Sequence, residues 1–312
     1  MPAPNLSADD VRNILNEIEI INIGEPIRGG QKLVLPIETS DNLYIAKFIE
    51  ITPNKMIGGE GDEDVFEDNS LGRLRREIEI LKICECDNLV KLAPFGLNHI
   101  KYNNKFLFYY VEEVVNGVDL SILHNQDYSF SVEEIIDFGL CINNAISALW
   151  EHKIIHRDIK PQNIIYDQTM RKFVLIDPGI AFDLNDVSYT QVGCVAGTMC
   201  FMSPEQLKPS ERRSLDFRSD HFLMGLCMYM MATATHPFYL GASTPMEVHY
   251  NILHNKHESA INLNKNMPKG LSLLIDRLLS KEPHLRYRNC ITLGQELLKA
   301  KDDFLQITGE TI

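Results

Sequence analysis

Two short polar runs, separated by an apolar segment, constrain what this chain can fold into more than any other feature. The first run is His156-Arg157-Asp158-Ile159-Lys160-Pro161-Gln162-Asn163, and the second is Asp177-Pro178-Gly179. The apolar residues 173–176 lie directly before the second run, so the two runs stand at hairpin distance from each other. Together they contain two carboxylates, a lysine and two amides, which can act jointly only if the fold brings them to one place.

These residue types are the ones that phosphoryl transfer needs. One carboxylate accepts the proton of the attacking hydroxyl, a lysine stabilises charge on the transferred group, and an amide and a second carboxylate hold magnesium ions. In this chain those roles fall, in order, on Asp158, Lys160, Asn163 and Asp177. The two runs resemble the catalytic loop and the metal-binding loop of the eukaryotic-like (Hanks-type) protein kinase family. His-Arg-Asp alone would occur by chance, but the whole run followed by a second Asp is specific.

Length, charge and cysteine usage disfavour several other classes of protein. The 312 residues are enough for two modest lobes with real cores. A net charge of −13 disfavours general binding to nucleic acid or to anionic lipid. The sequence has no apolar run of the ~18–20 residues that span a membrane, and residues 1–10 lack the features of a secretory signal. Because the seven cysteines are dispersed and odd in number, we expect reduced thiols and a cytoplasmic location.

The first part of the chain has a β-like pattern with helical segments on either side. Ser7 and the acids after it predict a helix start, followed by helical spacing of Val11, Ile14, Leu15 and Ile18. Breaks at Gly, Pro and Asn from about 19 to 48 favour strands, and two more strands are predicted within 93–114. Residues 52–70 predict a flexible acidic insertion, and residues 71–86 predict a helix.

The second part is mainly helical. Ser131 and Glu134 can form the capping box of a long helix, whose buried stripe would be Val132, Ile135, Phe138, Ile142, Ile146 and Leu149. Helical patterns continue to about residue 305. This order resembles the two-lobed kinase arrangement, an α+β fold with a small β-rich N-lobe and a larger helical C-lobe. The implied boundaries are a helical extension at 1–18, an N-lobe at 19–115 that includes the insertion at 52–70, a C-lobe at 116–306 and a tail at 307–312.

The resemblance, which covers about residues 20–300, also implies an ATP site. Lys47 matches the lysine that binds the α- and β-phosphates, and Glu77 would be its ion-pair partner. Glu112 falls at the gatekeeper position at the back of the adenine pocket, where a carboxylate is unusual. The remaining ATP contacts would be the backbone of Glu113 and Val115 at the adenine edge, Val34 and Ile45 above the ring, and Ile165 below it.

Two segments depart from the family pattern. The glycine-rich loop is incomplete, because an alignment on Val34 leaves Ile27, Gly29 and Lys32 at the three glycine positions, and a shifted register needs an insertion. Gly29 and Gly30 can still bring backbone N–H groups close to phosphate, and a plain hairpin turn is the alternative. Pro178 replaces the phenylalanine that follows this aspartate in the family, which predicts a loop that does not switch by swinging an aromatic ring.

The segment from Gly197 to Glu205 resembles the end of the kinase activation segment. Arg157 beside Asp158 suggests control by phosphorylation of that segment, since an Arg can pair with a phosphate. The candidate phosphosites are Ser188, Thr190 and Thr198, although Thr198 would also contact Asp158 and Lys160, and Ser188 and Thr190 can equally be ordinary loop residues. Three residues would have structural roles in the family: Asp220, which holds the catalytic loop, and the buried pair Glu205 and Arg286.

The resemblance implies a serine/threonine protein kinase that uses ATP with Mg²⁺ or Mn²⁺, because Lys160 is typical of Ser/Thr rather than tyrosine kinases. Its partner would be a protein with a Ser or Thr acceptor, with no nucleic acid and no membrane. A regulatory partner, or a homodimer for trans-autophosphorylation, is left open. The first alternative is a catalytically weak pseudokinase that serves as a nucleotide-binding scaffold, which the glycine loop and Pro178 favour. A small-molecule kinase is the second, and the segment from Gly197 to Glu205 disfavours it.

Overall fold

The computed structural model describes residues 3–29, 32–51, 82, 84–103, 105–177, 200–208, 210 and 215–309. The described chain falls into two compact units, divided between Val115 and Asn116, with residues 85–89 joining the second unit. Several sequence expectations lie outside the described residues. They are the acidic insertion at 52–70, almost all of the helix expected at 71–86, whose last residues 84–86 are not helical, and Pro178.

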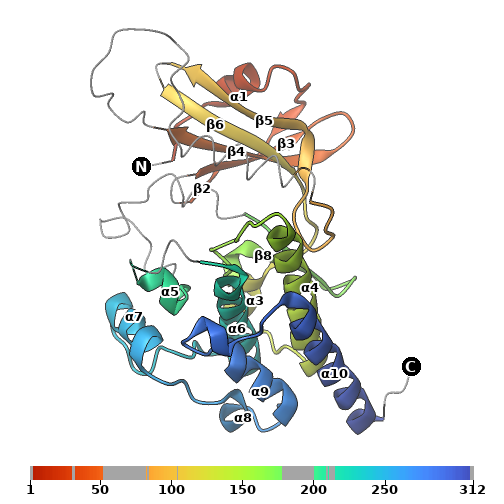
Figure 1. Ribbon diagram of the computed structural model, residues 1–312. Coiled ribbons are helices and arrows are strands. Elements are labelled where there is room, and N and C mark those ends of the chain that lie inside the picture. The colour runs from red at the N-terminus through yellow and green to blue at the C-terminus, as the bar shows by residue number, and fades with distance from the viewer. Residues whose placement is uncertain are drawn as a thin grey trace. The chain divides into compact units, whose positions relative to one another are not determined.

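The first unit is built on an antiparallel sheet, formed by the segments where the β-like pattern predicts strands (Figure 1). Its described strands are β1 (Asn22–Ile23), β2 (Ile27–Gly29), β3 (Lys32–Glu38), β4 (Leu43–Ile51), β5 (Leu92–Tyr102) and β6 (Lys105–Glu113). The order across the sheet is β1-β3-β4-β6-β5, and β2 pairs with β3. The predicted strands within 19–48 and 93–114 are therefore confirmed.

One face of this sheet carries the core of the first unit. Because successive side chains alternate between faces, the residues that point to this face are Leu33, Leu35, Ile37, Tyr44, Ala46, Phe48, Leu107 and Val111, all of them buried. Helix α1 (Ala8–Ile14) packs its apolar residues into the same core. Its start is confirmed, since the side chains of Ser7 and Asp10 form a reciprocal capping box.

Helix α1 is shorter than the apolar spacing suggests. It ends at Ile14, and Leu15 has a non-helical backbone, yet Leu15 and Ile18 are as buried as the helical residues. Two turn hydrogen bonds, from Leu15 N to Val11 O and from Ile18 N to Leu15 O, keep the chain folded against the sheet. Val11, Ile14, Leu15 and Ile18 are thus part of the hydrophobic core of the first unit.

The second unit is organised around long helices (Figure 1). Helix α4 (Val132–Glu151) begins with the predicted capping box of Ser131 and Glu134. The predicted stripe is buried except for Val132, which is half-buried at the first helical position. A small antiparallel sheet joins β7 (Val118–Asp119), which directly precedes α3 (Leu120–Asn125), to β8 (Ile164–Asp167) and β9 (Lys172–Leu175), which follow α4. The hairpin of β8 and β9 places residue 163 near residue 177, as the sequence predicts.

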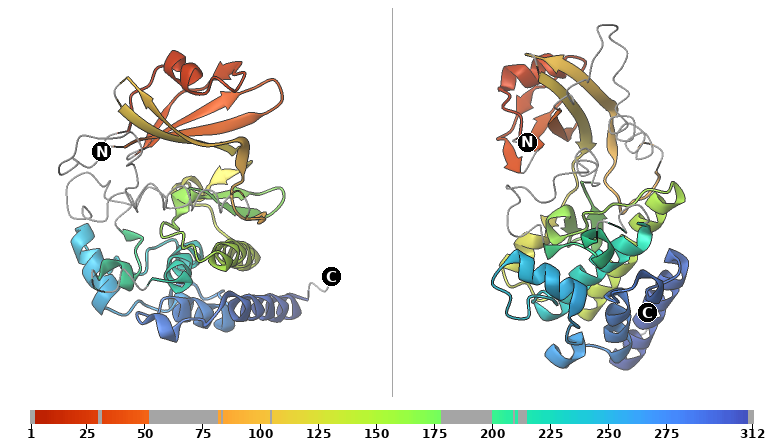
Figure 2. Two further views of the ribbon diagram at one scale, coloured as in Figure 1. Left: turned by 45° about the horizontal axis from the view of Figure 1, so that its top comes forward. Right: turned by 60° about the vertical axis from the view of Figure 1, so that its left-hand side comes forward.

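The helices after the catalytic region confirm the predicted helical pattern. They are α5 (Pro204–Leu207), α6 (Phe217–Thr233), α7 (Pro245–His254), α8 (Ala260–Leu263), α9 (Lys269–Leu278) and α10 (Cys290–Thr308). Helix α6 is buried around almost its whole circumference, and α10 runs beside α4 (Figure 2). At that contact Asn143 Nδ2 donates to Cys290 O at 3.0 Å. Within the described part of the chain, no helix is long and apolar enough to cross a membrane.

Candidate active site

The structure brings Asp158, Lys160 and Asn163 together in one polar cluster. Lys160 Nζ donates to both carboxylate oxygens of Asp158, at 3.0 and 2.8 Å. Asn163 Nδ2 donates to Asp158 Oδ2 and to its backbone carbonyl, both at 2.8 Å. Asp158 is buried, with 8% of its surface exposed. Its carboxylate is therefore held in one orientation and stays close to a positive charge.

The local backbone explains why these three side chains meet. Arg157 has a left-handed backbone, with φ of 66°, which turns the chain sharply just before Asp158. Pro161 then starts a 3₁₀ turn (η1, Pro161–Asn163), where its fixed φ suits the first position and its missing N–H costs nothing. Asn163 N donates to Lys160 O at 2.9 Å and closes the turn. The turn carries the amide of Asn163 back onto Asp158.

Asp220 anchors the start of this loop from helix α6. The N–H groups of His156 and Arg157 donate to its two carboxylate oxygens, each at 2.8 Å. Gln206, in α5, adds a hydrogen bond from its Nε2 to Arg157 O at 2.9 Å. Burial raises the pKa of Asp220 to about 7, although both N–H donors act to lower it. The loop is thus tied to the most buried helix of the second unit.

A backbone hydrogen bond of the preceding residue, Ile176, holds Asp177 close to Asn163 in the chain fold. Ile176 N donates to Asn163 O at 2.8 Å, and His156 Nε2 lies 3.3 Å from Ile176 O. Asp177 itself has a left-handed backbone, with φ of 59°, a conformation that aspartate adopts more readily than most residues. Because the amide nitrogen of Asn163 faces Asp158, its amide oxygen points away from that carboxylate. An amide oxygen and a carboxylate on adjoining segments are donors that suit Mg²⁺, which keeps water and phosphate as its other ligands.

In the first unit, Lys47 lies on the sheet face opposite to the α1 core. It is 3% exposed and pairs across the strands with Val34, while Ile45 shares its face by alternation. Its Nζ lies 2.6 Å from Glu112 Oε2, an ion pair that the sequence analysis did not anticipate. Only the strand register reveals this contact, since the two residues belong to strands that are distant in sequence. Glu77, the partner expected from the family, lies outside the described residues.

The other ATP-site positions are only partly described. Gly29 ends β2 and pairs with Lys32 of β3, and Gly30 lies outside the described residues. The N–H of Glu113 donates to Lys91 O at 2.9 Å. Val115 is half-buried, and Ile165 is a half-buried residue of β8 in the second unit. The phosphosite candidates Ser188, Thr190 and Thr198 lie outside the described residues.

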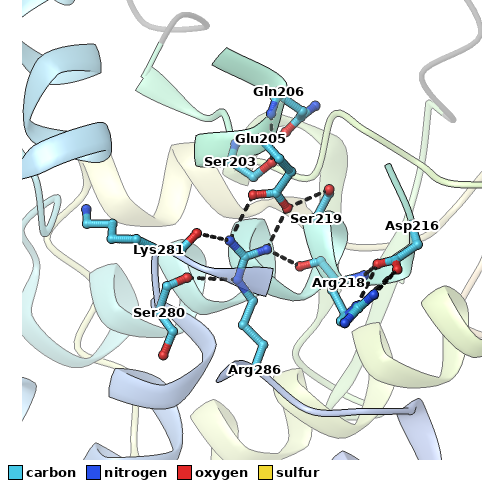
Figure 3. Close-up of polar contacts among 9 residues, drawn as sticks. All are labelled: Ser203, Glu205, Gln206, Asp216, Arg218, Ser219, Ser280, Lys281 and Arg286. Atoms are coloured by element: carbon cyan, nitrogen blue, oxygen red, sulfur yellow. Dashed lines mark hydrogen bonds and ion pairs between the residues drawn. The ribbon is translucent and has the colours of Figure 1, made fainter. Parts of the chain in front are cut away.

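Glu205 and Arg286 form a buried bidentate ion pair (Figure 3). Arg286 donates to both carboxylate oxygens of Glu205, at 2.6 and 2.9 Å, and Ser219 Oγ donates to Glu205 Oε1 at 2.7 Å. Further guanidinium N–H groups bind the backbone carbonyls of Arg218, Ser280 and Lys281. Burial acts to raise the pKa of Glu205, but the hydrogen bonds and charge of Arg286 outweigh it, so this pKa lies below its usual value.

A hollow of about 590 Å³ opens beside the catalytic loop, within the second unit. Pro161 and Gln162 of the loop line it together with side chains from α3, the end of α6 and the segment after it. Among the described residues that line it, Glu258 supplies the one carboxylate, and none is Lys or Arg. The apolar and aromatic part of the lining includes Phe201, Met230, Tyr239 and Leu240.

Comparison with known families identifies the class of this protein. The family model described as "Protein kinase domain" matches residues 50–298, most of the chain, so this chain belongs to the protein kinase domain family. The predicted resemblance to the Hanks-type serine/threonine kinases is confirmed. The match begins after Lys47, so Gly29 and Gly30 lie outside the matched residues.

Several curated bacterial proteins are similar to the chain. A probable serine/threonine-protein kinase of Clostridium acetobutylicum is 31% identical over 198 residues, which cover 63% of this chain and 29% of that protein. The serine/threonine-protein kinase PrkC of Bacillus subtilis is 25% identical over 282 residues, which cover 90% of this chain and 42% of that protein. The chain therefore spans less than half the length of these relatives.

Solved structures show the same fold. Rad53 1–466 in complex with AMP-PNP matches with a TM-score of 0.67 and 20% identity, over 91% of this chain and 65% of that chain. The PknI kinase domain of Mycobacterium tuberculosis matches with a TM-score of 0.60 and 13% identity, over 90% of this chain and 94% of that chain. The α+β two-lobed protein kinase fold is thus confirmed.

Proposed function

We propose that this chain is a serine/threonine protein kinase, which transfers the γ-phosphoryl group of ATP to a hydroxyl group of a protein. The observation that carries this proposal is the cluster in which Lys160 and Asn163 fix the carboxylate of Asp158. A general base must be held within reach of one proton, and a buried, doubly bonded carboxylate meets that requirement. The serine/threonine specificity is supported by the names of the curated relatives.

In the proposed mechanism the protein positions the reactants and stabilises charge. Asp158 orients the acceptor hydroxyl and receives its proton, while Lys160 stabilises negative charge that develops on the transferred group. Asn163 and Asp177 are the residues that would hold Mg²⁺, or Mn²⁺, which when bound neutralises phosphate charge. Lys47 would contact the α- and β-phosphates, and Val34 and Ile45 would cover one face of the adenine.

The pseudokinase and the small-molecule kinase are weaker alternatives. An intact cluster of Asp158, Lys160 and Asn163 supports catalysis, because a scaffold would not need a base, a cation and an amide in mutual contact. The curated relatives are named as serine/threonine-protein kinases, and the matching family model is that of protein kinases. Both observations disfavour a metabolite as the acceptor.

The hollow beside Pro161 and Gln162 is the proposed seat of the protein segment that flanks the acceptor. The chain carries a net charge of −13, yet the described lining of this hollow contains one carboxylate and neither Lys nor Arg. Apolar and aromatic lining favours an apolar side chain of the substrate over a charged one. We therefore expect the preferred acceptor to carry an uncharged, apolar residue close to its Ser or Thr.

Peptides that differ in one flanking residue test this substrate class. A peptide with Leu near the acceptor should have a kcat/KM about ten-fold above that of the same peptide with Lys, because it is costly to take a charged side chain out of water against a mainly apolar and aromatic lining. Met230→Glu, which places a carboxylate in the lining, should reverse this preference. A wild-type preference for the Lys peptide would contradict the expectation.

Regulation and location remain parts of the proposal. Autophosphorylation at Ser188, Thr190 or Thr198 would supply a phosphate for Arg157, and a second copy or a regulatory partner would then control activity. We keep the cytoplasmic location as an expectation from the cysteine pattern. A panel of Ser, Thr and Tyr peptides with Mg²⁺ and labelled ATP tests the activity itself. Label on Ser or Thr that is lost with Asp158→Asn is expected, whereas label on Tyr alone, or on metabolites alone, would contradict the proposal.

A further inference from the structure

The side chains of Lys47 and Glu112 meet on one face of the sheet of the first unit. In the pairing of β4 with β6, Lys47 lies opposite Tyr110 and Ile45 lies opposite Glu112. Lys47 and Glu112 are therefore diagonal neighbours whose side chains point to the same face. The Nζ–Oε2 distance is 2.6 Å, and the two side chains are 4% and 3% exposed. Two opposite charges are thus buried together within a single, continuous sheet.

The fold itself does not explain this pair. Phe108 and Tyr110, which flank the pair on the same strand face, are almost fully buried, and the Tyr110 ring lies 5.8 Å from Lys47 Nζ. Removing two charges from water is costly, and apolar residues of similar size at such a place are often as stabilising or more so. A buried pair at this position therefore points to a requirement for a lysine with a fixed, permanent charge.

We propose that Glu112 is a positioning residue for Lys47, and that its carboxylate holds the ammonium group in place for the phosphates of bound ATP. This inference rests on the proposed function, in which Lys47 contacts those phosphates. Lys47 and Glu112 lie on directly paired strands, so the register of the sheet sets their geometry. The register of the sheet then contributes to the orientation of Lys47.

Three substitutions of Glu112 separate charge from shape. Glu112→Gln keeps the size of the side chain and removes its charge, and should lower kcat/KM for Mg²⁺-ATP by about ten-fold, while the KM for the peptide acceptor stays unchanged. Glu112→Asp keeps the charge on a shorter side chain, and its kcat/KM should fall less than that of Glu112→Gln. Glu112→Leu removes both the charge and the hydrogen bonding, and its kcat/KM should fall the most. Glu38→Gln, at an exposed carboxylate of β3, is the matched control.

A double-mutant cycle shows whether Glu112 acts through Lys47. The affinity for a fluorescent ATP analogue is measured for the wild type, Glu112→Gln, Lys47→Met and the combined variant. If Glu112 serves only to position Lys47, then Glu112→Gln should change affinity less than about two-fold once Lys47 is Met. Thermal unfolding of each variant checks that it is folded. If Lys47→Met does not fold, the kcat/KM values of the three variants at position 112 still test the positioning role. They should fall in the order Asp, Gln, Leu.

The outcomes separate the inference from the function on which it rests. An unchanged kcat/KM in Glu112→Gln, or an equal loss of affinity with and without Lys47, would overturn the positioning role. A loss of affinity in Glu112→Gln that disappears when Lys47 is replaced by Met supports the positioning role. Failure of the proposed function has a different signature, namely a wild-type protein that binds the ATP analogue and transfers no phosphate. The binding cycle remains readable in that case.

Discussion

At the scale of single residues, charge in this protein is placed where neighbouring groups hold it. Asp158 is fixed by Lys160 and Asn163, and Glu205 is fixed by Arg286 and Ser219. The two carboxylates differ in the cation that holds them. The ammonium group of Lys160 can exchange partners, whereas the planar guanidinium of Arg286 forms a fixed bidentate contact with Glu205. The first arrangement suits catalysis, and the second suits stability.

Removal of one partner of the buried pair should destabilise the second unit strongly. Glu205→Ala leaves the guanidinium of Arg286 without its carboxylate, and we expect a loss of about 3–5 kcal/mol in the free energy of unfolding. Urea denaturation of the variant beside the wild type measures this loss. The double variant Glu205→Leu with Arg286→Leu removes both charges and should lose less than Glu205→Ala. A smaller loss in the single variant than in the double one would show that the pair contributes little.

At the scale of elements, local signals were readable from the sequence and long-range contacts were not. The capping boxes at Ser7 and Ser131 depend on residues three positions apart, so both helix starts could be predicted. The end of α1 could not, because apolar spacing continued to Ile18 while the chain left the helix after Ile14. The Lys47–Glu112 contact requires the register of β4 with β6, which no local pattern specifies.

The packing of α1 predicts that the N-terminal residues are needed for stability. Ile14 is 3% exposed within the core of the first unit, so Ile14→Ala should cost about 2–4 kcal/mol of unfolding free energy. Arg12→Ala, on the exposed side of the same helix, should change it by less than about 0.5 kcal/mol. Urea denaturation of both variants gives the comparison. Equal, small effects would mean that α1 does not contribute to this core.

The anchor from α6 predicts a pH dependence of stability. Since burial raises the pKa of Asp220 to about 7, the folded state binds more protons than the unfolded state between about pH 4 and 7. The contribution of Asp220 should therefore be fully present below about pH 4 and be lost as the pH rises through 7. We expect the unfolding free energy of the wild type to fall relative to that of Asp220→Asn over this range. A wild-type unfolding free energy that rises relative to that of Asp220→Asn as the pH increases would contradict this sign.

At the scale of the whole molecule, the family model, the relatives and the fold agree on the class of this protein. The chain belongs to the protein kinase domain family, and its two units have the expected β-rich and helical character. The loop could be predicted because its residues are close in sequence and are closed by a 3₁₀ turn and a hairpin. The nucleotide side was less predictable, since its residues come from several strands and its glycine motif is incomplete.

The most direct test of the account is the intact mass of purified protein after incubation with Mg²⁺-ATP, followed by phosphopeptide mapping, beside Asp158→Asn. General-base catalysis contributes about 10²–10⁴ to a rate, so we expect phosphate on the wild type and at least a hundred-fold slower gain in the variant. EDTA should abolish the gain, and added Mg²⁺ or Mn²⁺ should restore it. Equal phosphate on both proteins would contradict the role of Asp158, and no transfer by the wild type, to itself or to any peptide, would contradict the kinase assignment.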